Sequence, residues 1–220
     1  VQPGDRLAVL SAGAYAMAWQ DSFLVRRVAL FEAWTPAQRS AWYGADSLRR
    51  VGVEAYGADG PTAARRLWRR SLARARAIPD SALIGGLSGN IGAAYLADGA
   101  LDSATAWLAW ADEVAGAIGD FRVQANAVGA LGAVAEDQGD LAGARRRYTE
   151  ATRIRERIGD TRGIAADQNN LGLLALGMGD LEEAGRYFES ALGLNRRDGQ
   201  ETVAATNLVN LAGIAATSRS

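Results

Sequence analysis

Residues 159–198 read GDTRGIAADQNNLGLLALGMGDLEEAGRYFESALGLNRRD, and the rest of the chain repeats this forty-residue pattern. The pair Leu171-Gly172 returns forty positions earlier as Leu131-Gly132, and then as Ile91-Gly92 and Val51-Gly52. Other columns recur at the same spacing: Gly159-Asp160, Gly119-Asp120 and Pro79-Asp80; Ala184, Ala144, Ala104 and Ala64; Phe188, Tyr148, Leu108 and Trp68. A fixed period of this length, kept without insertions, predicts an array of stacked units.

The spacing inside one copy predicts a hairpin of two helices. Asp160 stands at a helix N-cap before an apolar run of helical period, and Gly177-Met178-Gly179 ends that run. Asp180 and Glu183 then form a capping-box-like start for a second helix. Such a hairpin cannot bury its apolar face alone, so neighbouring copies must cover it.

The copies set the expected organisation of the chain. We assign residues 35–78, 79–118, 119–158 and 159–198 to repeats 1 to 4, and residues 199–220 to the first helix of an incomplete repeat 5. Residues 1–34 keep the register loosely and are predicted to be a degenerate repeat or N-terminal cap, with helices at 6–19 and 22–34 broken at Gln20-Asp21. The next helix is expected to start at Thr35-Pro36 and to end near Tyr56, before the turn Gly57–Pro61.

The residues at these columns resemble the tetratricopeptide repeat family in a form of roughly forty residues. The Leu171-Gly172 pair, the small Ala184 and Ala191 and the aromatic Phe188 carry the resemblance, which extends from about Ala37 to Ser220. Ser71 and Ala212 depart from the pattern but remain small. The resemblance implies an all-α fold, a right-handed α-solenoid of antiparallel helix hairpins. It also extends to bacterial multidomain proteins in which such repeats precede a caspase-like CHAT protease domain and regulate it.

Composition argues against catalysis. The chain has no Cys and no His, which removes disulfides, thiolate metal sites and the commonest catalytic base. The Gly-x-Gly strings are helix breaks without a preceding strand, and no phosphate-binding loop is present. We therefore predict a protein that is not an enzyme and that uses no cofactor or metal.

The charges are unevenly distributed although the net charge is only −1. Residues 1–78 hold 12 Arg and 6 acidic residues, whereas residues 79–120 hold 6 acidic residues and no Arg. One helix carries a basic face made of Arg65, Arg66, Arg69, Arg70, Arg74 and Arg76. Pairing of charges between neighbouring helices is the favoured interpretation. The alternative is a polyanion- or RNA-binding module that uses the Arg65–Arg76 helix.

Trp107 and Trp110 flank the buried column position Leu108, so both are expected to be partly exposed. Arg70 and Arg147 lie at the equivalent positions one repeat away, which predicts stacking of Trp110 with Arg70 and of Trp107 with Arg147. The other interpretation is a docking surface on the convex side, made by these four residues.

Asparagines form the polar constellation inside the repeat pattern. Asn90, Asn170 and Asn210 share a column with Arg50 and Ala130. Asn126, Asn169, Asn207 and Arg49 lie within a turn of that column in their own helices. Because first helices of such repeats line the concave groove, these side chains are predicted to bind the main chain of an extended peptide. Alternatively, each amide bonds a neighbouring helix or an ordered water, and the sequence leaves both open.

The prediction for function is a non-catalytic scaffold that binds a protein or peptide in its concave groove, as a regulatory part of a larger protein. We expect a cytoplasmic location, no membrane span and no nucleic-acid partner. The chain starts at Val1 without Met or a leader, so we expect either that a signal peptide was removed earlier or, as the favoured interpretation, that the chain is an excised portion of a longer protein. The last helix keeps an uncovered apolar stripe, so self-association through it, or a cover from another domain, is expected. That stripe consists of Leu208, Leu211, Ala212, Ile214 and Ala215.

Overall fold

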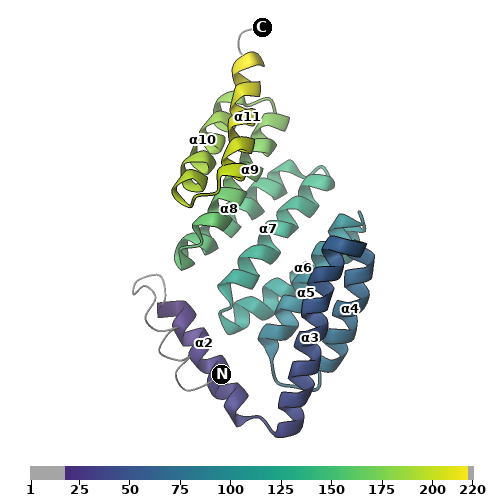
Figure 1. Cartoon of the computed structure of the whole chain (residues 1–220). Helices are drawn as coiled ribbons and strands as arrows, with labels where there is room; N and C mark the ends of the chain where they lie inside the picture. The colour runs from purple at the N-terminus through teal and green to yellow at the C-terminus, as the bar shows by residue number, and fades with distance from the viewer. Residues whose placement is uncertain (1–17, 218–220) are drawn as a thin grey trace. The chain divides into compact units, whose positions relative to one another are not determined.

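The structure is a computed structural model in which residues 18–217 are described, with side chains from residue 24 onward. The described residues form helices and no strand, so the all-α fold class is confirmed (Figure 1). The helices are α2 (Ala18–Ala33), α3 (Pro36–Asp59), α4 (Pro61–Ala75), α5 (Ser81–Ala97), α6 (Leu101–Ile118), α7 (Phe121–Asp137), α8 (Leu141–Ile158), α9 (Thr161–Gly177), α10 (Leu181–Arg197) and α11 (Glu201–Thr217).

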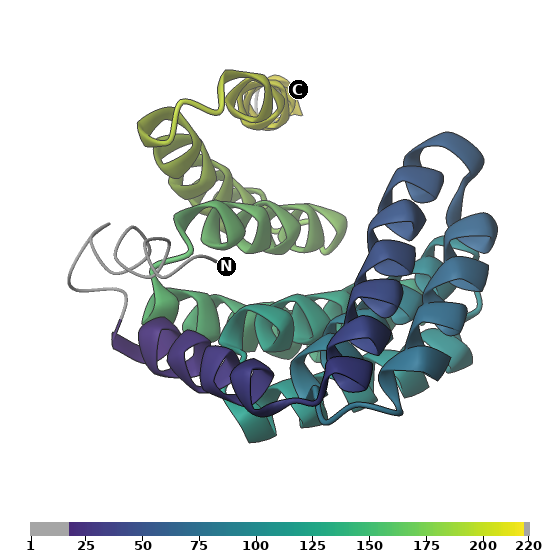
Figure 2. The same cartoon turned by 60° about the horizontal axis from the view of Figure 1, so that its bottom comes forward.

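The chain divides into two compact units, with the boundary between Gln124 and Ala125 inside α7. In the first unit, α3 packs on α4, α4 on α5 and α5 on α6. In the second, α8 packs on α9, α9 on α10 and α10 on α11. Figure 2 shows the first of these pairs, α3 and α4, as antiparallel neighbours joined by a tight turn.

A glycine facing a large side chain brings the two helices of each hairpin together. A Cβ added to Gly132 would lie 2.8 Å from Tyr148 Cδ1, and one added to Gly92 would lie 2.6 Å from Leu108 Cγ. Tyr148 and Leu108 are both buried, so these rings and methyl groups occupy the space that a Cβ would need. The small residues Ala104, Ala144 and Ala184 are fully buried beside them. The repeated small–large columns are therefore the contact surface of the hairpins.

The turns repeat every twenty residues. Gly159 and Gly179 have φ values of 67° and 80°, a conformation in which an L side chain is strained, and each ends the preceding helix. The following Asp160 and Asp180 accept hydrogen bonds from backbone N–H groups of Gly163 and Glu183, at 3.0 and 2.9 Å. The Gly-Asp pair thus stops one helix and caps the next.

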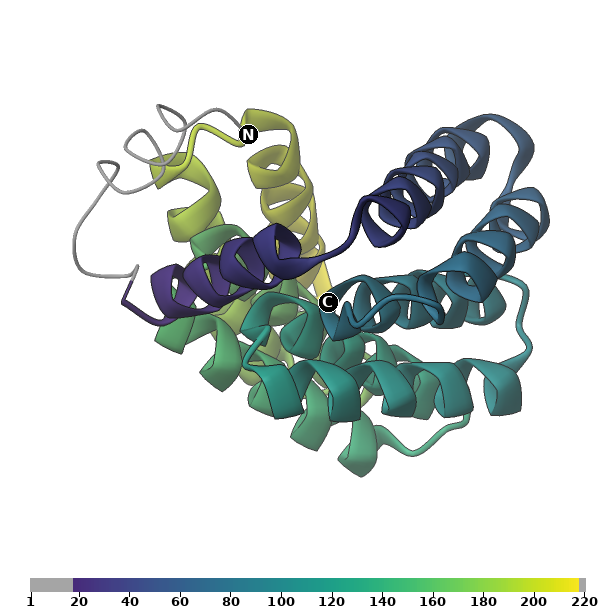
Figure 3. The same ribbon diagram turned by 90° about the horizontal axis from the view of Figure 1, so that it is seen from below.

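Two details differ from the sequence-based expectation. The predicted break at Gln20-Asp21 is wrong, because α2 runs through both positions. Neither glycine nor proline interrupts the chain there, and an aspartate alone is a weak stop signal. The predicted helix end near Tyr56 is also too early: α3 continues through Gly57 to Asp59, and only Gly60 separates it from α4. Figure 3 shows the connection from α2 into α3. At the start of α3, Thr35 and Gln38 form a capping box.

Candidate functional site

The asparagine column of the second unit lies on α9 and α11. Asn170 and Asn210 are half-buried, and Asn126 on α7 is exposed. Within the part of the chain that the structure describes, none of these three side chains makes a hydrogen bond. Their donors and acceptors are therefore available to a ligand or to water.

Exposed apolar side chains accompany these amides. On α9, Leu173 and Leu176 follow Asn169 at helical spacing and are 42% and 36% exposed. On α11, Val209 precedes Asn210 and is 70% exposed. The solvent-exposed face of α9 and α11 thus offers amide groups beside apolar contact area, the combination that an extended peptide needs.

Asn207 does not lie on this face. The sequence placed it among the groove residues, but its side chain is fully buried. It accepts a hydrogen bond from Asn195 Nδ2 on α10 at 2.9 Å and donates one to Asn169 Oδ1 on α9 at 3.0 Å. Asn207 therefore links three helices, and Asn169 is the only one of the three asparagines that is half-buried rather than buried.

A buried ion pair takes the place of this amide pair one repeat earlier. Arg155 of α8 donates to Asp167 of α9 at 2.9 Å and to Asp160 at 3.0 Å, and Thr152 also donates to Asp167. Burial raises the pKa of Asp167 to about 6, although the arginine opposes this shift. Its position in the core beside arginine makes Asp167 a structural carboxylate.

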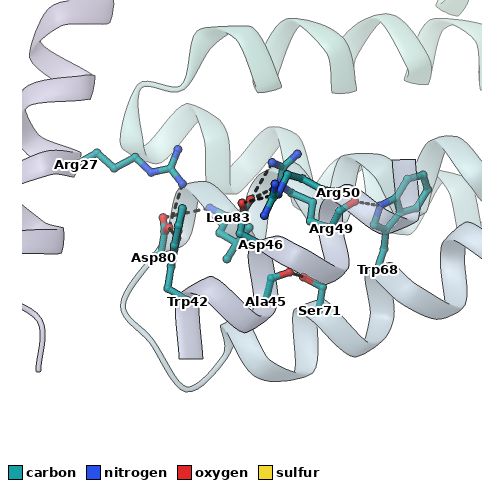
Figure 4. A network of polar contacts seen from close by, with 10 residues as sticks. All are labelled: Arg27, Trp42, Ala45, Asp46, Arg49, Arg50, Trp68, Ser71, Asp80 and Leu83. Atoms are coloured by element: carbon teal, nitrogen blue, oxygen red, sulfur yellow. Dashed lines mark hydrogen bonds and ion pairs between the residues drawn. The ribbon is translucent and has the colours of Figure 1, made fainter. Parts of the chain in front are cut away.

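Asn90, Arg49 and Arg50 are the predicted groove residues of the first unit. Asn90 on α5 is half-buried and makes no hydrogen bond with another described residue. Arg49 and Arg50 on α3 both pair with Asp46 of the same helix, at 2.8 and 3.3 Å (Figure 4). Both guanidinium groups are therefore already engaged by a carboxylate of their own helix, at i−3 and i−4.

A second carboxylate, Asp80, organises the start of α5. It is 2% exposed and accepts hydrogen bonds from Arg27 of α2 at 3.0 Å and from Trp42 Nε1 of α3 at 2.7 Å (Figure 4). It also caps α5 through the backbone N–H of Leu83. A cleft of about 310 Å³ opens beside it, lined by residues of α2, the start of α5 and the end of α6.

The basic face of α4 is only partly neutralised. Arg65 pairs with Asp98 at the end of α5, and its guanidinium lies 4.2 Å from the centre of the Tyr95 ring. The hydrogen bond from Arg65 also lowers the pKa of Asp98. Arg66, Arg70 and Arg76 are exposed and form no ion pair with any described residue. The expected pairing of repeat 1 with repeat 2 thus involves one arginine of the six.

The tryptophan pair is packed inward. Trp107 and Trp110 are half-buried against the core of the first unit, with their ring centres 5.6 Å apart. The predicted stacking of Arg70 on Trp110 is absent among the described residues, where the arginine–aromatic contact is that of Arg65 with Tyr95. Arg147 pairs with Glu150 at 3.1 Å. Trp107 and Arg147 belong to different units, so their stacking and the convex docking surface stay predictions.

Among residues 18–217, no group of three or more acidic side chains could hold a metal ion. No helix in the same range has the length and apolar character needed to cross a membrane.

Residues 123–216, which cover α7 to α11, match the family model of the tetratricopeptide repeat. This confirms the resemblance drawn from the Leu-Gly and Ala-Phe columns. No curated protein matches the sequence.

Solved structures extend the similarity to most of the chain. BtubC (BKLC) from P. vanneervenii is 19% identical with a TM-score of 0.70, over 90% of this chain and 81% of that one. A Rap protein, solved in complex with Competence and Sporulation Factor, is 13% identical with a TM-score of 0.63, over 77% of this chain and 53% of that one. RapI in its apo form is 11% identical with a TM-score of 0.70, over 80% of this chain and 64% of that one. At these identities the similarity shows the shared fold.

Proposed function

We propose that this tetratricopeptide repeat chain is a non-catalytic scaffold that binds an extended peptide segment of a partner protein across α9 and α11. The observation that carries the proposal is the set of unengaged amides, Asn170 and Asn210, beside the exposed side chains Leu173 and Val209. Amides form hydrogen bonds with a peptide main chain, and apolar side chains accept its alternate residues.

Two further observations support this function. The chain has no Cys and no His, so nucleophile–base pairs that depend on them are absent. The structurally similar Rap protein was solved in complex with Competence and Sporulation Factor, which supports a binding role for the same fold here. We further propose that binding regulates a larger protein of which this chain is part.

The test is selection from a library of random peptides displayed on phage, followed by calorimetric titration of the tightest peptide. Asn170→Ala combined with Asn210→Ala removes two amides, and the loss of two hydrogen bonds should weaken binding by about 5- to 100-fold. The matched control is Arg66→Gln combined with Arg70→Gln, which alters the exposed face of α4 and should leave the peptide Kd unchanged. Thermal unfolding of both double variants checks that the fold is retained.

The proposal fails if no peptide is selected, or if the selected peptide binds the asparagine variant as tightly as the wild type. Binding that is lost in the arginine control and falls steeply with salt would instead favour the polyanion-binding alternative.

A further inference from the structure

Asn169 differs from the neighbouring groove asparagines because a buried residue holds its side chain. Its Oδ1 accepts a hydrogen bond from Asn207 Nδ2 at 3.0 Å. Asn207 is itself held by Asn195, whose Nδ2 donates to Asn207 Oδ1 at 2.9 Å. Asn195 and Asn207 are 3% and 0% exposed, so the hydrogen bond between them is shielded from water, and the bond to Asn169 is partly buried. Hydrogen bonds in such surroundings are costly to leave unmade.

These two consecutive hydrogen bonds, from Asn195 to Asn207 and from Asn207 to Asn169, form a relay that fixes which end of the Asn169 side-chain amide is available to a ligand. With Oδ1 engaged, the two N–H groups of Nδ2 remain, and no hydrogen bond from Asn169 Nδ2 occurs among the described residues. Asn170 and Asn210 have no such restraint and can present either end of the amide to a ligand.

The forty-residue register shows that the relay accompanies the groove asparagine. The positions of Asn195 and Asn207 are filled one repeat earlier by Arg155 and Asp167, and the position of Asn169 is then Gly129. Two repeats earlier the same positions hold Ala115, Ala127 and Gly89. Where the groove position has no side chain, the buried partner is a carboxylate or an alanine. Among these three copies, a groove asparagine occurs together with a buried hydrogen-bond donor only in the copy that contains Asn169 and Asn207.

We propose that Asn207 is a positioning residue that turns Asn169 Nδ2 toward the groove, so that this position binds a hydrogen-bond acceptor, a main-chain carbonyl oxygen of the bound peptide. The orientation of the Asn169 amide is inferred from the two hydrogen bonds alone. The identity of the acceptor, a carbonyl oxygen of a peptide, rests on the proposed function. The two parts are tested separately.

The first experiment needs no ligand. Scalar couplings across hydrogen bonds, measured by NMR on the full chain labelled with ¹⁵N and ¹³C, should connect Asn207 ¹⁵Nδ2 with Asn169 ¹³Cγ, and Asn195 ¹⁵Nδ2 with Asn207 ¹³Cγ. A coupling in the opposite direction, from Asn169 Nδ2 to Asn207 Cγ, overturns the proposal. So does the absence of both couplings together with rapid solvent exchange of the Asn207 side-chain amide.

The second experiment uses the tightest peptide from the phage selection as the probe. Asn207→Asp still accepts from Asn195 but cannot donate, so the Asn169 amide should turn and present its oxygen to the groove. The peptide Kd should then rise about tenfold, as for one lost hydrogen bond. Adding Asn169→Ala to Asn207→Asp should weaken binding no further, because the donor is already lost.

Asn207→Leu is the second variant, in case a buried carboxylate prevents folding. It releases the Asn169 amide from its restraint, and the Kd should rise by about three- to tenfold. Additive effects of Asn169→Ala and either Asn207 variant, or an unchanged Kd with both, overturn the positioning role while the proposed function stands. If the library yields no binding peptide, the proposed function fails and the couplings still decide the orientation of Asn169.

Discussion

A Cβ on Gly172 would lie 2.7 Å from Phe188 Cε1, so the ring of α10 occupies the space that any larger residue of α9 would need. Phe188 is fully buried and cannot move aside into solvent. Because the same relationship holds at Gly132 with Tyr148, the close approach belongs to the repeat and not to one hairpin. This contact brings α9 into the position from which Asn169 and Asn170 reach the surface.

Gly172→Ala should therefore destabilise the second unit by about 1–3 kcal/mol, since the extra methyl group overpacks the contact with Phe188. The matched control is Gly193→Ala in α10, where a Cβ meets no atom within 4 Å. That change should stabilise the chain by about 0.5–1 kcal/mol through helix propensity. Urea unfolding followed by far-UV circular dichroism measures both. Equal effects of the two substitutions would contradict the packing argument.

Asp80 should matter more to stability than its role as a helix cap explains. Asp80→Ala removes the α5 cap and leaves Trp42 Nε1 and Arg27 without their acceptor, so a loss of about 2–4 kcal/mol is expected. Asp120, forty residues later, caps α7 through the N–H of Val123 and is the control. Asp120→Ala should cost only about 1 kcal/mol.

Tryptophan fluorescence is the readout for this pair, because all six tryptophans precede residue 111 and therefore report on the first unit. Losses of the same size for Asp80→Ala and Asp120→Ala would show that the contacts of Arg27 and Trp42 add nothing.

The sequence predicted the hairpins well because their determinants are local. The Gly-Asp turns and the small–large columns lie within one copy, and the predicted caps Asp160 and Asp180 directly precede the observed α9 and α10. The prediction that Asn207 lies in the groove was wrong because its side chain is buried against Asn195 of the preceding helix. The repeat column that contains Asn170 carries no information about that contact. The twelve-residue spacing shared by Arg155–Asp167 and Asn195–Asn207 was the signal that could have revealed it.

The Arg70–Trp110 contact failed for a different reason. Equal positions in adjacent repeats were expected to bring the two side chains together, but Trp110 packs partly buried against the core of the first unit, whereas Arg70 is exposed and forms no ion pair with a described residue. Trp107 and Trp110 pack against apolar side chains of the core, while Arg65 pairs with Asp98 and lies over the Tyr95 ring. The repeat spacing therefore predicts which residues lie near each other, but it does not predict which side chains make contact.

The raised pKa of Asp167, about 6 against an ordinary 3.8, makes stability depend on pH. Between these values the folded chain keeps a proton that the unfolded chain has lost, so the free energy of unfolding should fall as pH rises from about 4 to 6. The expected size is roughly 2–3 kcal/mol, lost by pH 7. The comparison is with Asp167→Asn, which still accepts from Arg155 but does not titrate.

The difference in unfolding free energy between wild type and Asp167→Asn, followed by circular dichroism in urea from pH 4 to 7, isolates this carboxyl from the others. A difference that stays constant with pH, or that changes in the wild type's favour as pH rises, would contradict a raised pKa.

The outer face of α11 provides the last prediction. Leu208 and Val203 are 44% and 47% exposed, whereas Leu211 and Ile214 are half-buried against the cluster around Phe188. Exposed apolar side chains on a terminal repeat favour association, so the 23.1 kDa chain should form larger species as its concentration rises in sedimentation equilibrium. Leu208→Glu should return it to the mass of a single chain. Leu173→Glu on α9, where the leucine is 42% exposed, is the control and should leave association unchanged. A wild type that stays at the single-chain mass at every concentration, or an equal response to both substitutions, would show that the face of α11 does not mediate self-association.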